Sequence, residues 1–143
     1  MLKSGPRNAA RGKEEDVDRA TSPSSIDLLR VVIVDDQQTF RQAARRLLAA
    51  RGYDVVEEAD CATCALDAVE RHEPAAVLLD VRLGEHDGFD LCGALTRRRP
   101  GLAILLASDD DPDQHQERAA RCGARGYVPK SRLHEADLGR FWN

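Results

Sequence analysis

The chain of 143 residues has few aromatic residues, no long apolar run and no excess of positive charge. No apolar run approaches the roughly 18 residues that a membrane-spanning helix needs, so we expect no contact with a membrane. No charged and then apolar leader with a small-residue cleavage site is visible, which predicts a cytoplasmic protein. The formal net charge of -4 gives no electrostatic basis for direct binding to nucleic acid. A content of 4% aromatic and 42% hydrophobic residues fits an α/β domain rich in Ala, Leu and Val.

The sequence has only four cysteines, Cys61, Cys64, Cys92 and Cys122. A cytoplasmic location predicts that they are reduced thiols. The segment from Cys61 to Cys64 is a C-x-x-C pattern, which also occurs in redox and zinc sites, but no second C-x-x-C accompanies it. We therefore interpret the four as packing or surface thiols. A thiol redox protein working through Cys61 and Cys64 is a rival hypothesis. It requires a reversible disulfide between them and unusual thiol acidity, and it leaves the Asp, Ser and Lys residues at the strand ends unexplained.

Residues 1–28 differ in composition from the rest of the chain. They contain Ser, Pro, Gly and mixed charges, with almost no large apolar residue before Ile26, and five basic residues offset five acids. Such a segment cannot bury enough apolar area to offset the entropy lost on ordering. We expect a disordered N-terminal tail over residues 1–28, followed by one domain over residues 29–143, which is long enough for a core.

From residue 29 onward, short apolar runs alternate with amphipathic segments. The expected strands are residues 29–34, 53–57, 75–80, 102–107 and 127–128. The expected helices are residues 37–51, 60–71 with Asp60 as the cap, 87–99, 112–122 and 131–142. This alternation predicts an α/β fold with a doubly wound parallel sheet, helices on both faces and right-handed crossovers.

One strand ends in an acid. Five apolar residues, Ala75–Leu79, run without alternation into Asp80, which is typical of a strand buried on both faces. Polar residues also end other expected strands: Asp35 and Asp36 follow the first, Ser108 the fourth, and Lys130 comes just past the fifth. In a doubly wound sheet these strand ends meet at the edge where ligands bind.

The residue types at this edge point to phosphoryl chemistry. Clustered carboxylates resist ionising together, and a divalent cation with oxygen ligands, Mg²⁺ or Ca²⁺, relieves their repulsion. A lysine and a hydroxyl nearby can bind the oxygens of a phosphoryl group. The set predicts phosphoryl transfer to one of the carboxylates.

The same residues resemble the receiver domain of response regulators, the phosphoacceptor half of two-component signalling. The matching stretches, which cover about residues 30–143, are Val34-Asp35-Asp36, Leu79-Asp80-Val81-Arg82-Leu83, Asp87-Gly88, Ser108 and Gly123 to Lys130. The resemblance implies a flavodoxin-like receiver fold, with five helices around a five-stranded parallel sheet in the order 2-1-3-4-5.

The resemblance also implies a role for each matching residue. Asp80 is similar to the phosphoacceptor. Asp35 and Asp36 are similar to the acidic pair that holds Mg²⁺ together with Asp80 and the backbone carbonyl of Arg82. Lys130 resembles the phosphoryl-binding lysine. Ser108 resembles the switch hydroxyl, and Tyr127 the aromatic residue that changes rotamer with it.

Each of these residues also has a simpler interpretation. Asp80 can be a cap without chemistry, and Lys130 a solvated surface residue. Tyr127 can be ordinary strand packing, and Ser108 a plain hydroxyl at a strand end. These alternatives remain open at the level of the sequence.

The chain departs from the family pattern near the expected site. Gly84 stands where receivers usually carry Pro, and Asp109 stands where they prefer Ala or Gly, which makes the loop after Ser108 acidic. This acidity should slow the entry of anionic phosphodonors. Arg82 and Asp110 have opposite charges, so we predict that they pair across the mouth of the site and limit attacking water.

The resemblance implies a response regulator that signals rather than an enzyme with its own substrate, and because no DNA-binding domain follows Trp142 in this sequence we expect a single-domain one. It would take a phosphoryl group on Asp80, with Mg²⁺, from a sensor histidine kinase or a phosphotransfer protein. The output would be contact with a downstream protein or phosphorelay, as a monomer or a weak homodimer. The alternative is a receiver-fold interaction module that works independently of phosphorylation, because Asp109 and the acidic loop block the switch.

Overall fold

The structure, a computed structural model, describes residues 28–110 and 115–143. Its main sheet contains β1 (Arg30–Val34), β2 (Asp54–Ala59), β3 (Ala76–Asp80), β6 (Ala103–Ser108) and β7 (Gly126–Pro129). All four pairings are parallel, and the order is β2-β1-β3-β6-β7. When only these five strands are numbered, in the order in which they occur along the chain, their order in the sheet is 2-1-3-4-5. The predicted topology is therefore confirmed.

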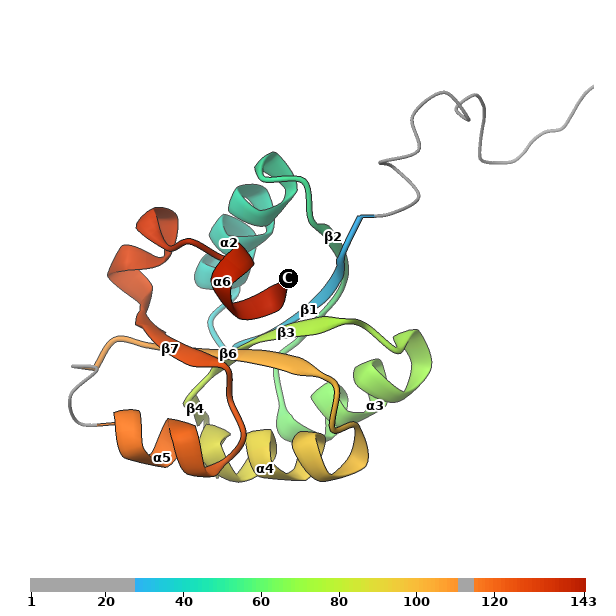
Figure 1. Cartoon of the computed structure of the whole chain (residues 1–143), viewed down its shortest axis with the longest axis vertical. Coiled ribbons are helices and arrows are strands. Elements are labelled where there is room, and N and C mark those ends of the chain that lie inside the picture. Colours follow the sequence, from blue (N-terminus) through green and yellow to red (C-terminus); the bar gives the residue numbers. More distant parts are fainter. Residues whose placement is uncertain (1–27, 111–114) are drawn as a thin grey trace, which may run out of the picture.

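Helices cover both faces of this sheet (Figure 1). They are α2 (Gln38–Ala50), α3 (Ala62–His72), α4 (Gly88–Arg98), α5 (Gln116–Arg121), the 3-10 helix η2 (Lys130–Glu135) and α6 (Gly139–Trp142). Helices α2 and α6 lie on one side, and α3, α4 and α5 lie on the other. This three-layer arrangement explains why the central strands are apolar without alternation.

The core consists of two layers, one on each face of the sheet. Along β3, Val77 and Leu79 belong to the layer beneath α3, α4 and α5, whereas Leu78 belongs to the layer beneath α2. These three side chains are at most 1% exposed. Successive side chains of one strand therefore enter opposite layers, and the end of β3 is held rigidly at the centre of the molecule.

The C-terminal segment differs from the single helix expected over residues 131–142. It forms η2, an extended break at Ala136, and the short helix α6. Leu133 and Leu138 are both buried in the layer beneath α2, yet five residues apart on one helix they would point about 140° away from each other. Breaking the helix lets both side chains reach the sheet.

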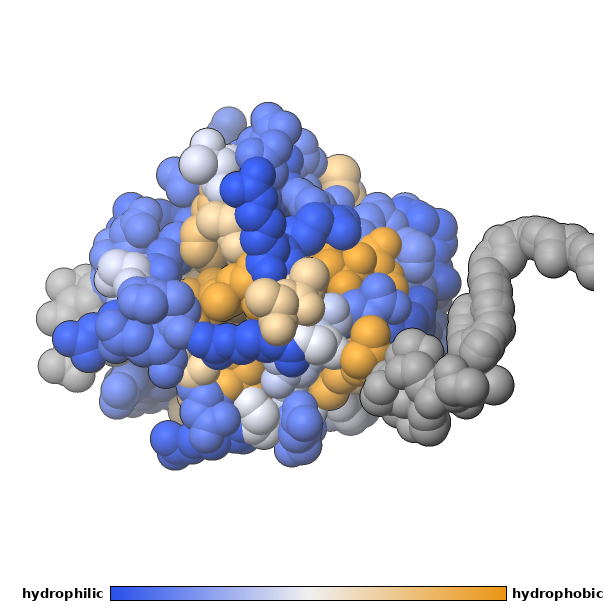
Figure 2. Space-filling model, turned by 90° about the horizontal axis from the view of Figure 1, so that it is seen from above, coloured by the Kyte–Doolittle hydropathy of each residue, from blue (hydrophilic) through white to orange (hydrophobic). Residues whose placement is uncertain are grey.

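The face that carries α2 and α6 is not uniformly hydrophilic. Viewed onto this face, apolar residues show between hydrophilic ones (Figure 2). The partly buried apolar residues packed on this layer are Leu29, Phe40, Leu47, Tyr53, Val55, Ala136 and Phe141. Among the described residues, Leu28 is the one large hydrophobic side chain classed as exposed, so these residues serve mainly as packing.

Several local expectations are corrected by the structure. The loop after β3 contains a two-stranded antiparallel hairpin, β4 (Arg82–Leu83) and β5 (His86–Asp87), that was not predicted. Its turn needs a left-handed backbone at Gly84, with φ of 61°, which glycine adopts without steric cost. The cap of α3 is Cys61 and not Asp60.

Two expectations fall largely on residues that the structure does not describe. The predicted disordered tail covers residues 1–28, of which 1–27 lie outside the described ranges. The predicted start of a helix at Pro112 also lies outside them, and α5 begins at Gln116. Within the described part of the chain, no helix is long and apolar enough to cross a membrane.

Candidate functional site

Asp80 is the last residue of β3 and lies at the carboxyl edge of the sheet. The residue is 6% exposed, and the backbone N–H of Arg82 donates to its Oδ1 at 3.2 Å. Gly88, at the start of α4, packs directly on this segment: a Cβ there would lie 2.2 Å from the backbone oxygen of Asp80. A glycine at position 88 is thus needed for the close approach of α4 to the acid.

Lys130 joins the two buried acids. Its Nζ lies 2.6 Å from Asp35 Oδ2 and 3.4 Å from Asp80 Oδ2, and the Lys130 side chain is 7% exposed. The ammonium group also lies 4.5 Å from the centre of the Phe40 ring. The structure therefore excludes a freely solvated lysine and places the cation where the sequence predicted it.

The electrostatics of this trio are strongly coupled. Burial, followed by the charge of Asp35, raises the pKa of Asp80 to about 6, although Lys130 and the Arg82 N–H act in the opposite direction. Burial alone would lower the pKa of Lys130, but the ion pair with Asp35 and the charges of the nearby acids raise it overall. Lys130 is therefore cationic at neutral pH, and Asp80 is mostly ionised.

Three carboxylates of the site could share a cation. Asp35, Asp36 and Asp80 each offer an oxygen, and these atoms lie within 4.8 Å of one another. Asp35 Oδ2 is fully buried and accepts no well-aligned hydrogen bond, although Lys130 lies beside it. A buried oxygen of this kind, within an oxygen-only set, fits Mg²⁺ or Ca²⁺. The predicted role of the Arg82 carbonyl stays a prediction.

Ser108 and Tyr127 both meet the loop that follows β6. Ser108 is 3% exposed, and its Oγ accepts a hydrogen bond from the backbone N–H of Asp110 at 3.1 Å. The half-buried Tyr127 donates its hydroxyl to the backbone oxygen of Asp110 at 3.4 Å, and burial raises its pKa. The two predicted switch residues are thus linked through one loop residue, and their movement stays a prediction.

The mouth of the site is a cavity of about 300 Å³. Its lining comes from four loops at the sheet edge: Asp36, Gln37, Asp80, Arg82, Gly84, Ser108, Asp109, Asp110 and Lys130. Arg82 donates to Asp110 Oδ2 at 2.7 Å, so the predicted pairing of these two side chains is confirmed. The Arg82 side chain is 74% exposed, as expected for a residue at the rim.

One residue that contacts the lining of the mouth could not be predicted from the sequence. His115 Nε2 lies 3.2 Å from Asp110 Oδ2, and its ring is tilted against Phe89 and Tyr127. The hydrogen bond with His115 and the charge of Arg82 hold the pKa of Asp110 below its ordinary value. Nothing in the spacing of the four histidines indicated this contact.

The chain is similar to response regulators of known sequence. It is 34% identical over 113 residues to response regulator MprA of Mycobacterium sp. (strain KMS), covering 79% of this chain and 49% of that protein. It is 29% identical over 103 residues to transcriptional regulatory protein DegU of Brevibacillus brevis, covering 71% of this chain and 44% of that protein. The chain thus spans about half the length of these curated relatives.

A solved structure has the same fold as this chain and a related sequence. The signal receiver domain of the response regulator NarL from Mycobacterium tuberculosis superimposes with a TM-score of 0.70 at 31% identity, covering 76% of this chain and 88% of that one. The site thus lies on a doubly wound α/β fold with acids and a lysine at the carboxyl edge. The sequence model of the response regulator receiver domain matches residues 31–138, and the chain belongs to that family. Members of the family are signalling modules of two-component systems, and phosphorylation and Mg²⁺ are general properties of the family.

Proposed function

We propose that this protein is a phosphoacceptor of two-component signalling that takes a phosphoryl group on Asp80 with Mg²⁺. The observation that carries the proposal is the placement of Lys130 between Asp35 and Asp80, at the floor of an open cavity. A structural cap needs no buried cation beside it, whereas a phosphoryl acceptor needs one to bind phosphoryl oxygens. We assign this function to a receiver domain over residues 29–143.

Asp80 acts as the nucleophile. One of its carboxylate oxygens bonds to phosphorus as the bond from phosphorus to the donor nitrogen or oxygen breaks, and the leaving group keeps that electron pair. With a pKa of about 6, Asp80 is mostly deprotonated at neutral pH and needs no separate base. Lys130 supplies positive charge to the phosphoryl oxygens, and Ser108 supplies a hydroxyl.

A divalent cation would be held by Asp35, Asp36 and Asp80, with the Arg82 carbonyl as a further ligand. When bound, Mg²⁺ neutralises charge on the phosphoryl oxygens during transfer. Asp35 and Asp36 thus have a binding role, whereas Asp80 has both a binding and a reacting role.

The partners follow from this chemistry. The donor is the phosphohistidine of a sensor histidine kinase or a phosphotransfer protein, in the cytoplasm. The output is contact with a downstream protein or onward phosphorelay, by a monomer or a weak homodimer with no contact to nucleic acid or membrane. The single-domain organisation stays a prediction.

The test is the mass of the intact protein after incubation with acetyl phosphate, with and without Mg²⁺, for the wild type and Asp80→Asn. The proposal predicts one added phosphoryl group that requires both Mg²⁺ and Asp80. An adduct of equal yield on Asp80→Asn would contradict it.

A beryllofluoride titration distinguishes a blocked entrance from a missing function. If acetyl phosphate gives no adduct, binding of beryllofluoride that needs Mg²⁺ and Asp80 would still support the acceptor site. Absence of binding as well would overturn the proposal in favour of an interaction module independent of phosphorylation. Partner binding that is indifferent to Asp80→Asn would favour the same alternative.

A further inference from the structure

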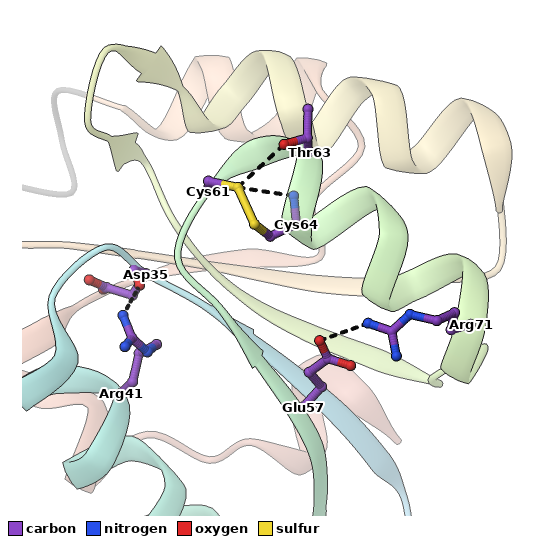
Figure 3. The surroundings of a disulfide bond; sticks show 7 residues. All are labelled: Asp35, Arg41, Glu57, Cys61, Thr63, Cys64 and Arg71. Carbon is purple, nitrogen blue, oxygen red and sulfur yellow. Dashed lines mark hydrogen bonds and ion pairs between the residues drawn. A yellow bond between two sulfur atoms is a disulfide. The ribbon is translucent and has the colours of Figure 1, made fainter.

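Cys61 and Cys64 are joined by a disulfide at the start of α3 (Figure 3). This corrects the expectation that all four cysteines are thiols. The two Cα atoms lie 5.1 Å apart, within the usual range for a disulfide, so the bond closes inside a single helical turn. The rival redox hypothesis required this pairing.

The disulfide contributes little to the stability of the fold. A disulfide stabilises a fold mainly by restricting the unfolded chain, and the effect grows with the length of the closed loop. Here the two cysteines are three positions apart, so little of the unfolded chain is restricted. The bond can therefore open and close without a large effect on the fold.

The surroundings of the bond favour exchange. Cys64 is exposed, so an incoming thiolate can reach its sulfur. Cys61 caps α3, and its Sγ accepts a hydrogen bond from the backbone N–H of Cys64 at 3.1 Å. Thr63 Oγ1 lies 3.4 Å from the same sulfur (Figure 3). A thiolate leaving at Cys61 would be stabilised by this N–H and by the N-terminus of α3.

The other two cysteines lack this arrangement. Cys92 is fully buried, and both Cys92 and Cys122 are free thiols. The Cys92 thiol donates to the backbone oxygen of Cys122, and the Cys122 thiol donates to that of Ala119. Their side chains also lie within hydrogen-bond reach of each other, so Cys122→Ser is the control that separates this pair from exchange at Cys61 and Cys64.

We propose that Cys61 and Cys64 form a reversible redox site that exchanges electrons with an external dithiol, either a protein or a small molecule. A thiolate of the dithiol attacks Cys64 Sγ, the Cys61–Cys64 bond breaks, and Cys61 leaves as a thiolate with the electron pair. The second thiolate of the dithiol then attacks the mixed disulfide, which releases Cys64. The external dithiol is oxidised to a disulfide, and the protein gains two electrons. The protons lost by the two attacking thiols go to solvent, and the released Cys61 and Cys64 thiolates take up protons as their pKa values and the pH dictate.

The redox site is distinct from the phosphoacceptor site but lies near it. The backbone oxygen of Ala59, two residues before Cys61, accepts a hydrogen bond from the N–H of Asp35 at 3.0 Å. No residue of the cavity at Asp80 belongs to the cysteine pair. The redox chemistry should therefore survive Asp80→Asn.

The test is a redox titration of the whole chain in mixtures of reduced and oxidised dithiothreitol. After equilibration of the native protein, acid quenching and alkylation in denaturant, the mass counts the free thiols. Two of the four cysteines are bonded, so we expect two alkyl groups in oxidising mixtures and four in reducing ones. A single two-electron transition should connect the two levels in both directions, and the Asp80→Asn variant should show the same transition.

Serine variants assign the transition to its residues. Cys61→Ser and Cys64→Ser should each carry three alkyl groups in every mixture. The matched control, Cys122→Ser, should keep the transition, from one group to three. Four groups in the most oxidising mixture, or a bond that dithiothreitol reduces only after unfolding, would overturn the proposal. A transition that is lost in Cys122→Ser and kept in Cys64→Ser would also overturn it.

Discussion

The floor and the rim of the cavity at Asp80 differ in how far their charged residues are exposed to water. The floor, which we define as Asp35, Asp80 and Lys130, is almost completely buried and consists of charges in direct contact. The rim, which we define as Arg82, Asp109 and Asp110, is partly or fully exposed. Both regions carry two acids and one base, yet only the floor is shielded from water.

Burial determines what each set of charges can do. Charges shielded from water interact strongly and shift each other's pKa values, as they do at Asp80 and Lys130. An exposed pair such as Arg82 and Asp110 is screened by solvent and salt, so it contributes little to stability. The floor should therefore decide whether phosphoryl transfer occurs, and the rim should adjust its rates.

The largest effect is expected from Lys130→Ala. The substitution leaves two buried carboxylates without their cation, which should cost about 3–5 kcal/mol of unfolding free energy at neutral pH without Mg²⁺. Added Mg²⁺ should restore part of the loss. The measurement is urea unfolding, and the control is Arg132→Ala, which removes an exposed cation two residues later. Equal losses in the two variants would contradict the distinction between buried and exposed charge.

The next largest effect is a dependence of the free energy of unfolding on pH that disappears in Asp80→Asn. The folded pKa of about 6 lies above the ordinary value of 3.8, so the folded state binds this proton more tightly than the unfolded state. The contribution of Asp80 to the free energy of unfolding should therefore fall as the pH rises from about 4 to about 6.

Asp80→Asn lacks this loss. Without Mg²⁺, the free energy of unfolding of Asp80→Asn relative to the wild type should be larger at about pH 7.5 than at about pH 4, by roughly 2–3 kcal/mol. Urea unfolding of both proteins at the two pH values measures this difference. A constant difference across the range would show that Asp80 is not destabilised by burial.

A smaller effect is expected at the rim. Arg82→Ala removes the pair with Asp110, and water should then hydrolyse phosphorylated Asp80 roughly 2- to 5-fold faster, the range that an exposed ion pair allows. The half-life of the phosphorylated protein in Mg²⁺ measures this change. Asp110→Asn removes the other member of the pair and should shorten the half-life in the same way. An unchanged half-life in Arg82→Ala would refute the idea that the pair limits attacking water.

The smallest effect is expected for Asp109→Asn. Removing one exposed negative charge near the cavity should raise the rate of phosphorylation by acetyl phosphate about 2-fold or less at low salt. The gain should shrink as the salt concentration rises, because screening acts on exposed charges. A gain that is independent of salt would point to a steric role for Asp109.

The fold and the floor were predictable because both depend on the pattern along single strands. Continuous apolar runs predicted parallel strands, and the polar residues at or shortly after the end of each run were predicted to lie at the shared edge. Asp80 and Lys130 were placed correctly by this argument, although they are 50 positions apart.

Other features depend on information that the linear pattern does not carry. His115 contacts Asp110, five positions earlier in the chain, and no periodic pattern in the sequence marks this pair. The break near Ala136 arises because two leucines must both reach the sheet, which is a matter of packing rather than helix propensity. A C-x-x-C segment occurs both with free thiols and with a disulfide. The interpretation as thiols was wrong for Cys61 and Cys64, because their pairing depends on three-dimensional geometry.

The most direct measurement compares one floor variant with one rim variant in the same reaction. The initial rate of phosphoryl addition from acetyl phosphate with Mg²⁺ is measured for the wild type, Asp35→Asn and Asp110→Asn. We expect the rate for Asp35→Asn to fall at least about 100-fold, because the substitution weakens both cation binding and the ion pair that positions Lys130. Asp110→Asn should stay within about 5-fold of the wild type. Equal losses, or a larger loss in Asp110→Asn, would contradict the assignment of the chemistry to the floor.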